Sequence, residues 1–330
     1  MKDYIKTLDR IYNYGNPSQD RTGVGTLSLF GEQMKFDLRN DKFPLLVHKK
    51  VSFKNILTEL LWFISGNTNI QPLRDQGNTI WDEWADEHGN LGPVYGRQWR
   101  KWKRYVEVMP MEAQNGILCR VEEVDQLKNV TEILLNSPDS RRAVVSAWNV
   151  SDLPDMALEP CHVLFQFYTR TLSLVERIEL SSDSSLLGKY NFGKRFSIAN
   201  EIHLLCAAIS EALDNEGIPK RTLSCRVDMR SMDFFLGTPY NVPSYALLTR
   251  MIARLCNMTA ETLTFHCGNA HIYSNHMQQV KELLSRSVSD LKTPRLTING
   301  NQKTIDDFQF SDFVLEDYHP MPVIKAPVAV

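Results

Sequence analysis

The chain has 330 residues and a formal net charge of -2. Apolar residues make up 43% of it and charged residues 23%, which is ordinary for a globular protein with a sizeable core. The near-neutral charge argues against a general DNA-binding or membrane-surface protein, because the field of the whole molecule attracts neither anionic partner.

The cysteine usage and the termini predict a cytoplasmic protein. Six cysteines are scattered without a CxxC pair, and the N-terminal MKDYIKTLDRIYNYG has no apolar leader. No uncharged run is long enough to cross a bilayer. His271 and His276 are five residues apart with no acidic residue between them, so we expect no metal site.

Arg21 lies in a glycine-containing turn, QDRTGVGTLSLF, ahead of a predicted strand. It is either an anion ligand that the turn exposes or a solvated turn arginine. Residues 53–65 (FKNILTELLWFIS) predict a helix that places Glu59 among leucines and a tryptophan. A carboxylate there is costly to bury unless it is hydrogen-bonded or useful, and a raised pKa would suit it to proton handling. A rim position that faces solvent is the alternative.

The middle of the chain offers aromatic and basic candidates. Trp81 and Trp84 share one side of a short helical turn, where they either stack a flat ring or pack in the core. Residues 100–116 predict a charged, irregular excursion. Arg141 and Arg142 precede a strand, as a surface salt-bridge face or as a phosphate-binding pair.

Cys161 begins an apolar strand within DMALEPCHVLFQFY, next to His162. A thiol at the mouth of a strand is a nucleophile only if a nearby cation or donor favours the thiolate, and most such cysteines are small core residues. Residues 224–237 predict another strand, 238–241 a turn, and 243–256 an amphipathic helix that includes Tyr245. The apolar tail that ends in Val330 is expected to dock on the protein.

Several stretches, in one order over nearly the whole chain, resemble the thymidylate synthase family. They are QDRTGVGTLSLFG, TELLWFISGNTNI, TIWDEWADEHGNLGPVYGRQWR, DSRRAVVSAWNV, DMALEPCH, RSMDFFLGTPYNVPSYALLTRMIA, NAHIYSNHM and KAPVAV. The resemblance implies an α/β (α+β) fold, with one catalytic domain over residues 1–330, a mixed β-sheet with flanking helices, and a homodimer interface on one sheet face. It also implies reductive methylation of dUMP to dTMP, with 5,10-methylene-tetrahydrofolate as donor of both carbon and hydride.

The resemblance assigns Cys161 as the nucleophile that adds to C6 of the uracil ring. Glu59 would organise water and proton transfer at the base, with Tyr95 and His162 in the same polar network. Asn241 would read the pyrimidine, because an amide both donates and accepts. Relatives that act on cytosine nucleotides carry aspartate at that position, so asparagine favours uracil.

The resemblance also assigns the phosphate site. Arg230 would bind phosphate and stabilise the thiolate, and Arg21 and Ser231 would complete the site on the same subunit. Arg141 and Arg142 resemble the pair that reaches the partner's phosphate across the dimer.

The remaining assignments concern the ribose and the folate. His271 and Tyr273 would bind the ribose hydroxyl. Asp233 belongs to both the nucleotide and the folate contacts. The expected folate contacts are Trp81, Trp84, Asp233, Gly237, Tyr240, Lys49 and Val330 at the end of a closing tail.

The chain departs from the family pattern mainly at residues 170–223, which replace a short hairpin and which we interpret as an inserted helical subdomain. Met229, Asp228, Asn269 and Pro243 are smaller departures. Two alternatives stay open: a dUMP hydroxymethylase, in which water captures the methylene intermediate, and a catalytically inactive binding protein on the same fold.

Overall fold

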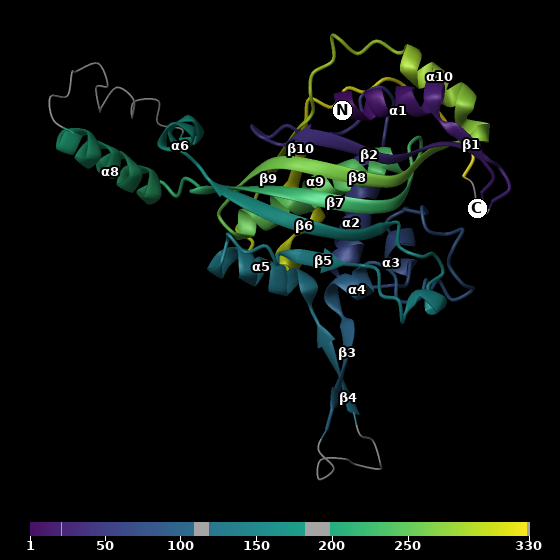
Figure 1. Cartoon of the computed structure of the whole chain (residues 1–330), viewed down its shortest axis with the longest axis horizontal. Coiled ribbons are helices and arrows are strands. Elements are labelled where there is room, and N and C mark those ends of the chain that lie inside the picture. The colour runs from purple at the N-terminus through teal and green to yellow at the C-terminus, as the bar shows by residue number, and fades with distance from the viewer. Residues whose placement is uncertain (21, 109–118, 182–198, 329–330) are drawn as a thin grey trace.

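The computed structural model describes residues 1–20, 22–108, 119–181 and 199–328. A mixed α/β body is built on a six-stranded sheet in the order β1-β2-β8-β7-β6-β5 (Figure 1). Only β7 and β8 run parallel, and the other neighbours pair antiparallel. The bounds are β1 Asn16–Ser18, β2 Thr26–Asp37, β5 Val144–Ser146, β6 His162–Thr171, β7 Arg221–Asp233 and β8 Thr259–Tyr273.

The strand register gathers residues that are far apart in sequence. Ser231 pairs with Asn269 and Asp233 pairs with His271, across the parallel β7–β8 ladder. His162 pairs with Met229 on the other side of β7, and the N–H of Arg230 donates to the carbonyl of Cys161 (3.0 Å). The start of β6 and the carboxyl ends of β7 and β8 therefore meet at one end of the sheet.

Helices cover one face of this sheet and its edges. The long helix α9 (Thr238–Leu255) packs on β7 and β8, and α2 (Phe53–Ile64) packs on α9 (Figure 1). Most of α9 is buried, so its apolar side chains join the sheet to α2 in one core. Further helices and strands of the body are α1 Lys2–Tyr14, α3 Gln71–Arg74, α4 Gly96–Arg100, α5 Gln126–Asn136, α10 Met277–Ser285, β9 Arg295–Ile298 and β10 Phe313–Glu316, with one-turn helices at Leu153–Asp155, Ser274–His276, Ile305–Asp307 and Phe310–Asp312.

Two expectations about local structure were wrong. Part of the excursion predicted over residues 100–116 is regular: β3 (Trp102–Glu107) pairs with β4 (Cys119–Val124), and the two strands extend away from the body (Figure 1), while residues 109–116 lie outside the described residues. Opposite charges face each other across it, as in Arg104 and Glu122, which supports the pairing. Residues 238–241 form the first helical turn of α9 and are not a separate reverse turn, because Pro239 fits the start of a helix.

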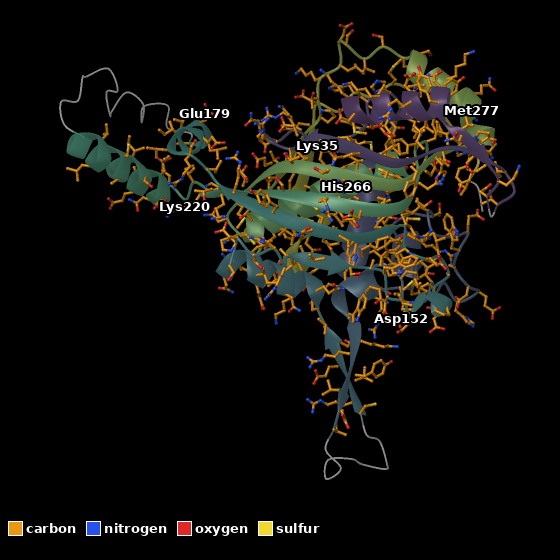
Figure 2. All side chains as sticks on the ribbon, viewed as in Figure 1. Lys35, Asp152, Glu179, Lys220, His266 and Met277 are labelled. Atoms are coloured by element: carbon orange, nitrogen blue, oxygen red, sulfur yellow. The ribbon has the colours of Figure 1, made fainter. Side chains whose placement is uncertain are left out.

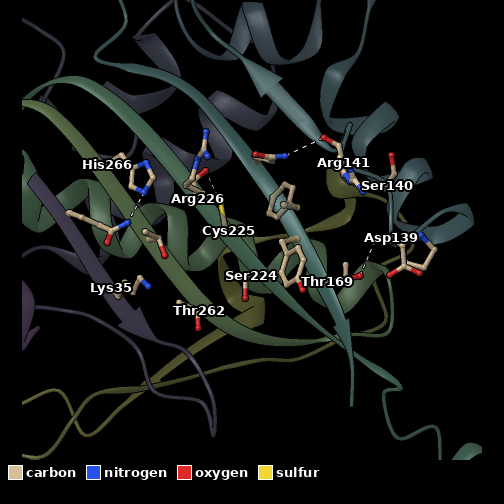
Figure 3. Close-up of a pocket in the computed structure, with 16 residues that line it drawn as sticks. Lys35, Asp139, Ser140, Arg141, Thr169, Ser224, Cys225, Arg226, Thr262 and His266 are labelled. Carbon is tan, nitrogen blue, oxygen red and sulfur yellow. Dashed lines mark hydrogen bonds between the residues drawn. The ribbon is translucent and has the colours of Figure 1, made fainter. Parts of the chain in front are cut away.

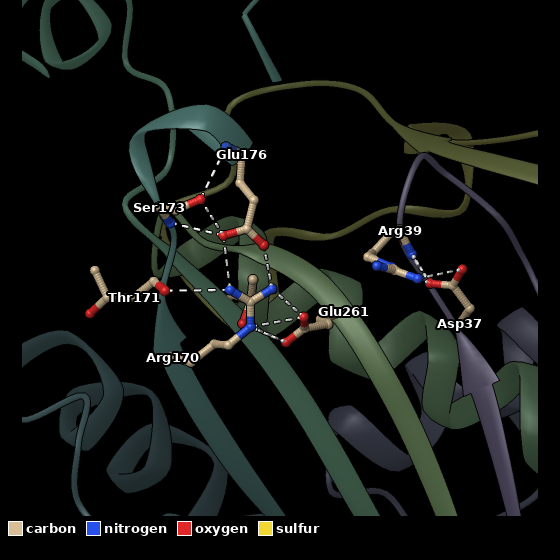
Figure 4. A network of polar contacts seen from close by, with 8 residues as sticks. Asp37, Arg39, Arg170, Thr171, Ser173, Glu176 and Glu261 are labelled. Atoms are coloured by element: carbon tan, nitrogen blue, oxygen red, sulfur yellow. Dashed lines mark hydrogen bonds and ion pairs between the residues drawn. The ribbon is translucent and has the colours of Figure 1, made fainter. Parts of the chain in front are cut away.

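The sequence predicts an insertion over residues 170–223; β6 continues to Thr171 and β7 begins at Arg221, so the segment between the two strands spans residues 172–220. It contains α6 (Leu174–Leu180) and α8 (Ala199–Asn215), which extend to one side (Figure 1). Arg170 anchors its base: the guanidinium contacts the carboxylates of Glu176 (2.7 Å) and of Glu261 on β8 (2.5 Å) (Figure 4).

Candidate active site

A cavity of about 810 Å³ opens where β6 begins and where β7 and β8 end. Its volume is in the range of a small-molecule site. The predicted residues that line it are Cys161, Arg230, Ser231, His271, Tyr273 and Trp84. Because β7 and β8 supply four of these six, the parallel register of the two strands is what assembles the site.

Cys161 is half-buried and lies between Tyr95 and Arg230. Its backbone N–H donates to the Tyr95 hydroxyl oxygen (2.9 Å). Burial raises the pKa of the thiol above its ordinary value, and the Arg230 charge and a hydrogen bond from the Tyr95 side chain offset part of that rise. These two groups are the cation and the donor that a nucleophilic thiolate needs.

Arg230 is held in place by the backbone that leads into Cys161. Its Nε donates to the carbonyl of Pro160 (2.9 Å), and one terminal nitrogen donates to the carbonyl of Glu159 (2.9 Å). The Glu159 carboxylate also lies 3.7 Å from that guanidinium. Arg230 is therefore oriented before any ligand binds. The Glu159 carboxylate competes with an anionic ligand for its guanidinium.

Glu59 projects from α2 and is half-buried among apolar residues. Its carboxylate accepts a hydrogen bond from the indole N–H of Trp81 (2.8 Å). Burial raises the pKa of Glu59 to about 7, and the bond from Trp81 lowers it in part. A carboxyl with a pKa near neutrality can both take up and release a proton at physiological pH.

His162 is buried next to Asn241. Burial lowers the pKa of His162 to about 3, so its ring is neutral. Its Nε2 lies 3.1 Å from the amide nitrogen of Asn241. This contact fixes one side of the Asn241 amide before a base is present.

The two ribose candidates lie side by side on β8. The rings of His271 and Tyr273 meet edge to face with centroids 5.1 Å apart. His271 Nδ1 lies 3.1 Å from the Asn269 side-chain oxygen, and burial lowers the pKa of the imidazole. We therefore expect a neutral His271 that offers its remaining nitrogen to a ligand.

The folate candidates differ in accessibility. Trp84 lines the cavity, whereas Trp81 is 8% exposed and packs on Trp84 with ring centroids 5.7 Å apart. Asp233 accepts hydrogen bonds from the backbone N–H groups of Phe235 (2.8 Å) and Leu236 (3.1 Å), which shapes the turn into α9. Gly237 is the N-cap of α9, and Tyr240, three residues on, is half-buried.

Lys49 is buried. Its ammonium donates to the carbonyl of Phe235 (2.8 Å) and lies over the Phe235 ring. Burial lowers the pKa of Lys49 to about 8. The side chain therefore supports the same Asp233–Gly237 turn and does not line the cavity.

Arg141 and Arg142 are not brought to Cys161 within one protomer. Both are exposed, and Arg141 lies at the rim of a separate hollow of about 540 Å³ on the open sheet face (Figure 3). Lys35 and His266 come from neighbouring strands of that face (Figure 2). Arg21 and Val330, the other two predicted contacts, lie outside the described residues.

The described part of the C-terminal tail is docked, as expected. Ile324 is buried, and the carbonyl of Pro327 accepts a hydrogen bond from Nε2 of the buried His276 (2.7 Å). The ring of His276 in turn packs against Tyr273. The tail is thus joined to the strand that carries the ribose candidates.

Sequence reasoning missed Glu159 and Tyr245. Glu159 stands two residues before Cys161. A carboxylate so close in sequence to a candidate nucleophile indicates an electrostatic effect on the thiol, and the sequence alone could have shown it. Tyr245 follows Asn241 by four residues, so the two share a face of α9. That spacing was readable, but the contact that Tyr245 makes with His162 required the structure.

No group of three or more histidine, cysteine, aspartate and glutamate side chains suited to a metal ion occurs among the residues that the structure describes. Within the same part of the chain, no helix is long and apolar enough to span a membrane.

The family model described as "Thymidylate synthase" matches residues 2–330. Three curated proteins named "Thymidylate synthase", from three strains of Coxiella burnetii, are each 41% identical to the chain over 330 residues. Each match covers 100% of both chains. From these matches and the mixed α/β fold, the chain belongs to the thymidylate synthase family of methyltransferases.

Proposed function

We propose that the protein catalyses the reductive methylation of dUMP to dTMP through a covalent adduct between Cys161 and the nucleotide. The observation that carries this proposal is the position of the Cys161 thiol, which lines the cavity between a fixed Arg230 and the Tyr95 hydroxyl. Addition of the thiolate to C6 makes C5 of the ring a carbon nucleophile.

The one-carbon unit and the hydride both come from 5,10-methylene-tetrahydrofolate. C5 bonds to the methylene carbon, which is still attached to a folate nitrogen. Loss of the C5 proton then breaks that carbon–nitrogen bond, so that tetrahydrofolate leaves and an exocyclic methylene remains on the ring. Hydride transfer to the resulting exocyclic methylene and departure of the Cys161 thiolate give dTMP and dihydrofolate. Glu59 handles the protons of this sequence, for which a pKa near 7 is suited.

The nucleotide is held at its phosphate, its base and its ribose. We assign the phosphate to Arg230, Ser231 and Arg21, the base to Asn241 and the ribose hydroxyl to His271 and Tyr273, with Asp233 next to the nucleotide. A guanidinium that the backbone already orients binds a phosphate dianion at little further cost in entropy.

The folate is assigned to the neighbouring surface and the tail. Trp84 and Trp81 stack it, and Asp233, Gly237 and Tyr240 contact it from the turn into α9. Lys49 acts there through its bond to Phe235. Closure of the tail up to Val330 excludes water, so that hydride rather than water captures the methylene intermediate.

We propose a homodimer formed across the open face of the sheet, with Arg141 and Arg142 contributed to the partner's phosphate site. The position of both arginines supports this, because they are exposed and Arg141 borders the hollow on that face. An isologous contact would carry each pair toward the other protomer.

We also infer that α6 and α8 form an inserted helical subdomain. Their contact buries Ile178, Ile209 and Leu213 in a cluster separate from the main core. Arg177 is buried beside this cluster and pairs with Asp214 (2.7 Å).

The proposal is tested with dUMP that carries tritium at C5, incubated with methylene-tetrahydrofolate. We expect release of tritium into water by the wild-type protein and none by Cys161→Ala, with dUMP binding retained in the variant. Tritium release by Cys161→Ala would exclude the covalent mechanism. Asn241→Asp should shift binding toward dCMP, and unchanged discrimination would show that another group reads the base.

A further inference from the structure

Tyr245 lies one helical turn after Asn241 on α9, and both side chains meet the same imidazole. The Tyr245 hydroxyl lies 3.2 Å from His162 Nδ1, and the amide nitrogen of Asn241 lies 3.1 Å from His162 Nε2. His162 therefore has a polar partner at each ring nitrogen. The four-residue spacing on α9 allows this, because such residues lie above one another on a helix.

The protonation of this set of three residues follows from the chemistry of each group. Burial lowers the pKa of His162 to about 3, so the ring is neutral and carries a single proton. The Asn241 amide nitrogen only donates, so Nε2 must accept. The proton is therefore on Nδ1 and is donated to the Tyr245 oxygen. A proton on Nε2 would instead face an amide N–H.

We propose that Tyr245 is a positioning residue for base selection: it accepts the Nδ1 proton of His162 and so holds the Asn241 amide in the orientation that matches uracil. The inference rests on the proposed function, in which Asn241 contacts the pyrimidine. Uracil presents an N3–H donor and an O4 acceptor, whereas cytosine presents an N3 acceptor and an amino donor. An amide turned by half a rotation exchanges its oxygen and nitrogen and matches cytosine.

The surroundings of Tyr245 hold its hydroxyl in place. The residue is 2% exposed, and its ring packs against those of His162, Phe165, Phe265 and Trp99 at centroid distances of 5.3, 5.4, 5.9 and 6.3 Å. The ring cannot swing away from His162 without opening the core. Phenylalanine fills the same space, so Tyr245→Phe removes the acceptor and keeps the packing.

In Tyr245→Phe the Nδ1 proton of His162 loses its acceptor inside the core. Leaving a buried donor unpaired is unfavourable, and a neutral imidazole can move its proton to the other nitrogen. Nε2–H then donates to the Asn241 oxygen once the amide has turned. The variant should therefore bind dCMP better relative to dUMP, with the rest of the site unchanged.

The first measurement is long-range ¹⁵N NMR of histidine-labelled full-length protein, with the His162 signals identified from a His162→Gln spectrum. We expect the proton of His162 on Nδ1 in the wild type and on Nε2 in Tyr245→Phe. The second is calorimetric binding of dUMP and dCMP without folate. We expect the ratio of the two affinities to fall by about two- to ten-fold in Tyr245→Phe, which is the scale of one hydrogen bond.

Tyr4→Phe is the matched control, because it also removes a buried tyrosine hydroxyl, one that donates to the Phe234 carbonyl (2.8 Å). Its affinity ratio should equal that of the wild type. A wild-type His162 protonated on Nε2, or an affinity ratio that Tyr245→Phe leaves unchanged, overturns the inference. If either of these two results is obtained and the protein still makes dTMP, only this inference is refuted. If the protein binds neither dUMP nor dCMP, the proposed function is refuted as well.

Discussion

Replacement of Glu59 by glutamine should stabilise the fold at alkaline pH and leave its stability unchanged at acidic pH. The glutamine carbonyl can still accept the indole N–H of Trp81, so the substitution removes the charge and keeps the hydrogen bond. The expected gain comes from the free energy that the native state expends to ionise a carboxyl in an apolar site.

The magnitude follows from the pKa of Glu59, which burial raises from 4.5 to about 7. At about 1.4 kcal/mol per pH unit, ionisation in the native state costs up to about 3 kcal/mol more than in the unfolded chain. The unfolded carboxyl releases its proton near pH 4.5 and the folded one near pH 7. Between these values the native state binds more protons, so the wild-type free energy of unfolding falls as pH rises.

The assay is urea unfolding of the wild type and of Glu59→Gln at a series of pH values and at one protein concentration. Other ionisable groups affect both proteins alike and cancel in the difference. We expect equal stability at pH 4.5 and below, a difference that grows toward pH 7, and a plateau of up to about 3 kcal/mol above it. A difference that does not depend on pH, or a variant less stable than the wild type at pH 8.5, would refute the reasoning.

Three further predictions concern other parts of the molecule. Glu159→Gln should lower the pH midpoint for alkylation of Cys161 and tighten binding of inorganic phosphate by about two- to five-fold, because a carboxylate beside Arg230 is removed; unchanged values for both would show that Glu159 is a bystander. A mixture of the Cys161→Ala and Arg141→Ala proteins should regain activity through hybrid dimers. If no activity returns after subunit exchange has been confirmed, a phosphate site shared between subunits is contradicted. Arg177→Leu should make α6 and α8 sensitive to limited proteolysis, because it removes the bonds from α6 to Ser210, Asp214 and the Ile218 carbonyl and leaves Asp214 paired with Lys220 alone; protection equal to the wild type would place their stability in the apolar cluster alone.

The sequence predicted which residues gather around Cys161 better than it predicted the local structure of other segments. The cavity around Cys161 was predictable, because the matching motifs end the strands that carry Arg230 and His271, and the register of those strands makes them neighbours. The buried position of Lys49 was not predictable, because a pair of lysines ahead of a helix suggests a solvated surface. Its bond to Phe235 connects residues 186 positions apart.

The β3–β4 pairing, which joins Glu107 to Cys119, was missed for a different reason: Asn115-Gly116 between them is a hairpin turn signal that the interpretation as an irregular excursion left unused. Tyr245 was readable as a core residue of an amphipathic helix. Its polar function depends on His162, which reaches it from a different strand. Contacts between elements that lie far apart in sequence, rather than local patterns, decided the positions of Lys49 and Tyr245.

The most direct test of the proposed reaction is identification of its products. The protein is incubated with dUMP and 5,10-methylene-tetrahydrofolate, nucleotides are analysed by mass spectrometry, and dihydrofolate is followed by absorbance. We predict dTMP with one equivalent of dihydrofolate. Hydroxymethyl-dUMP without dihydrofolate would contradict the account, because water rather than hydride would then capture the methylene intermediate.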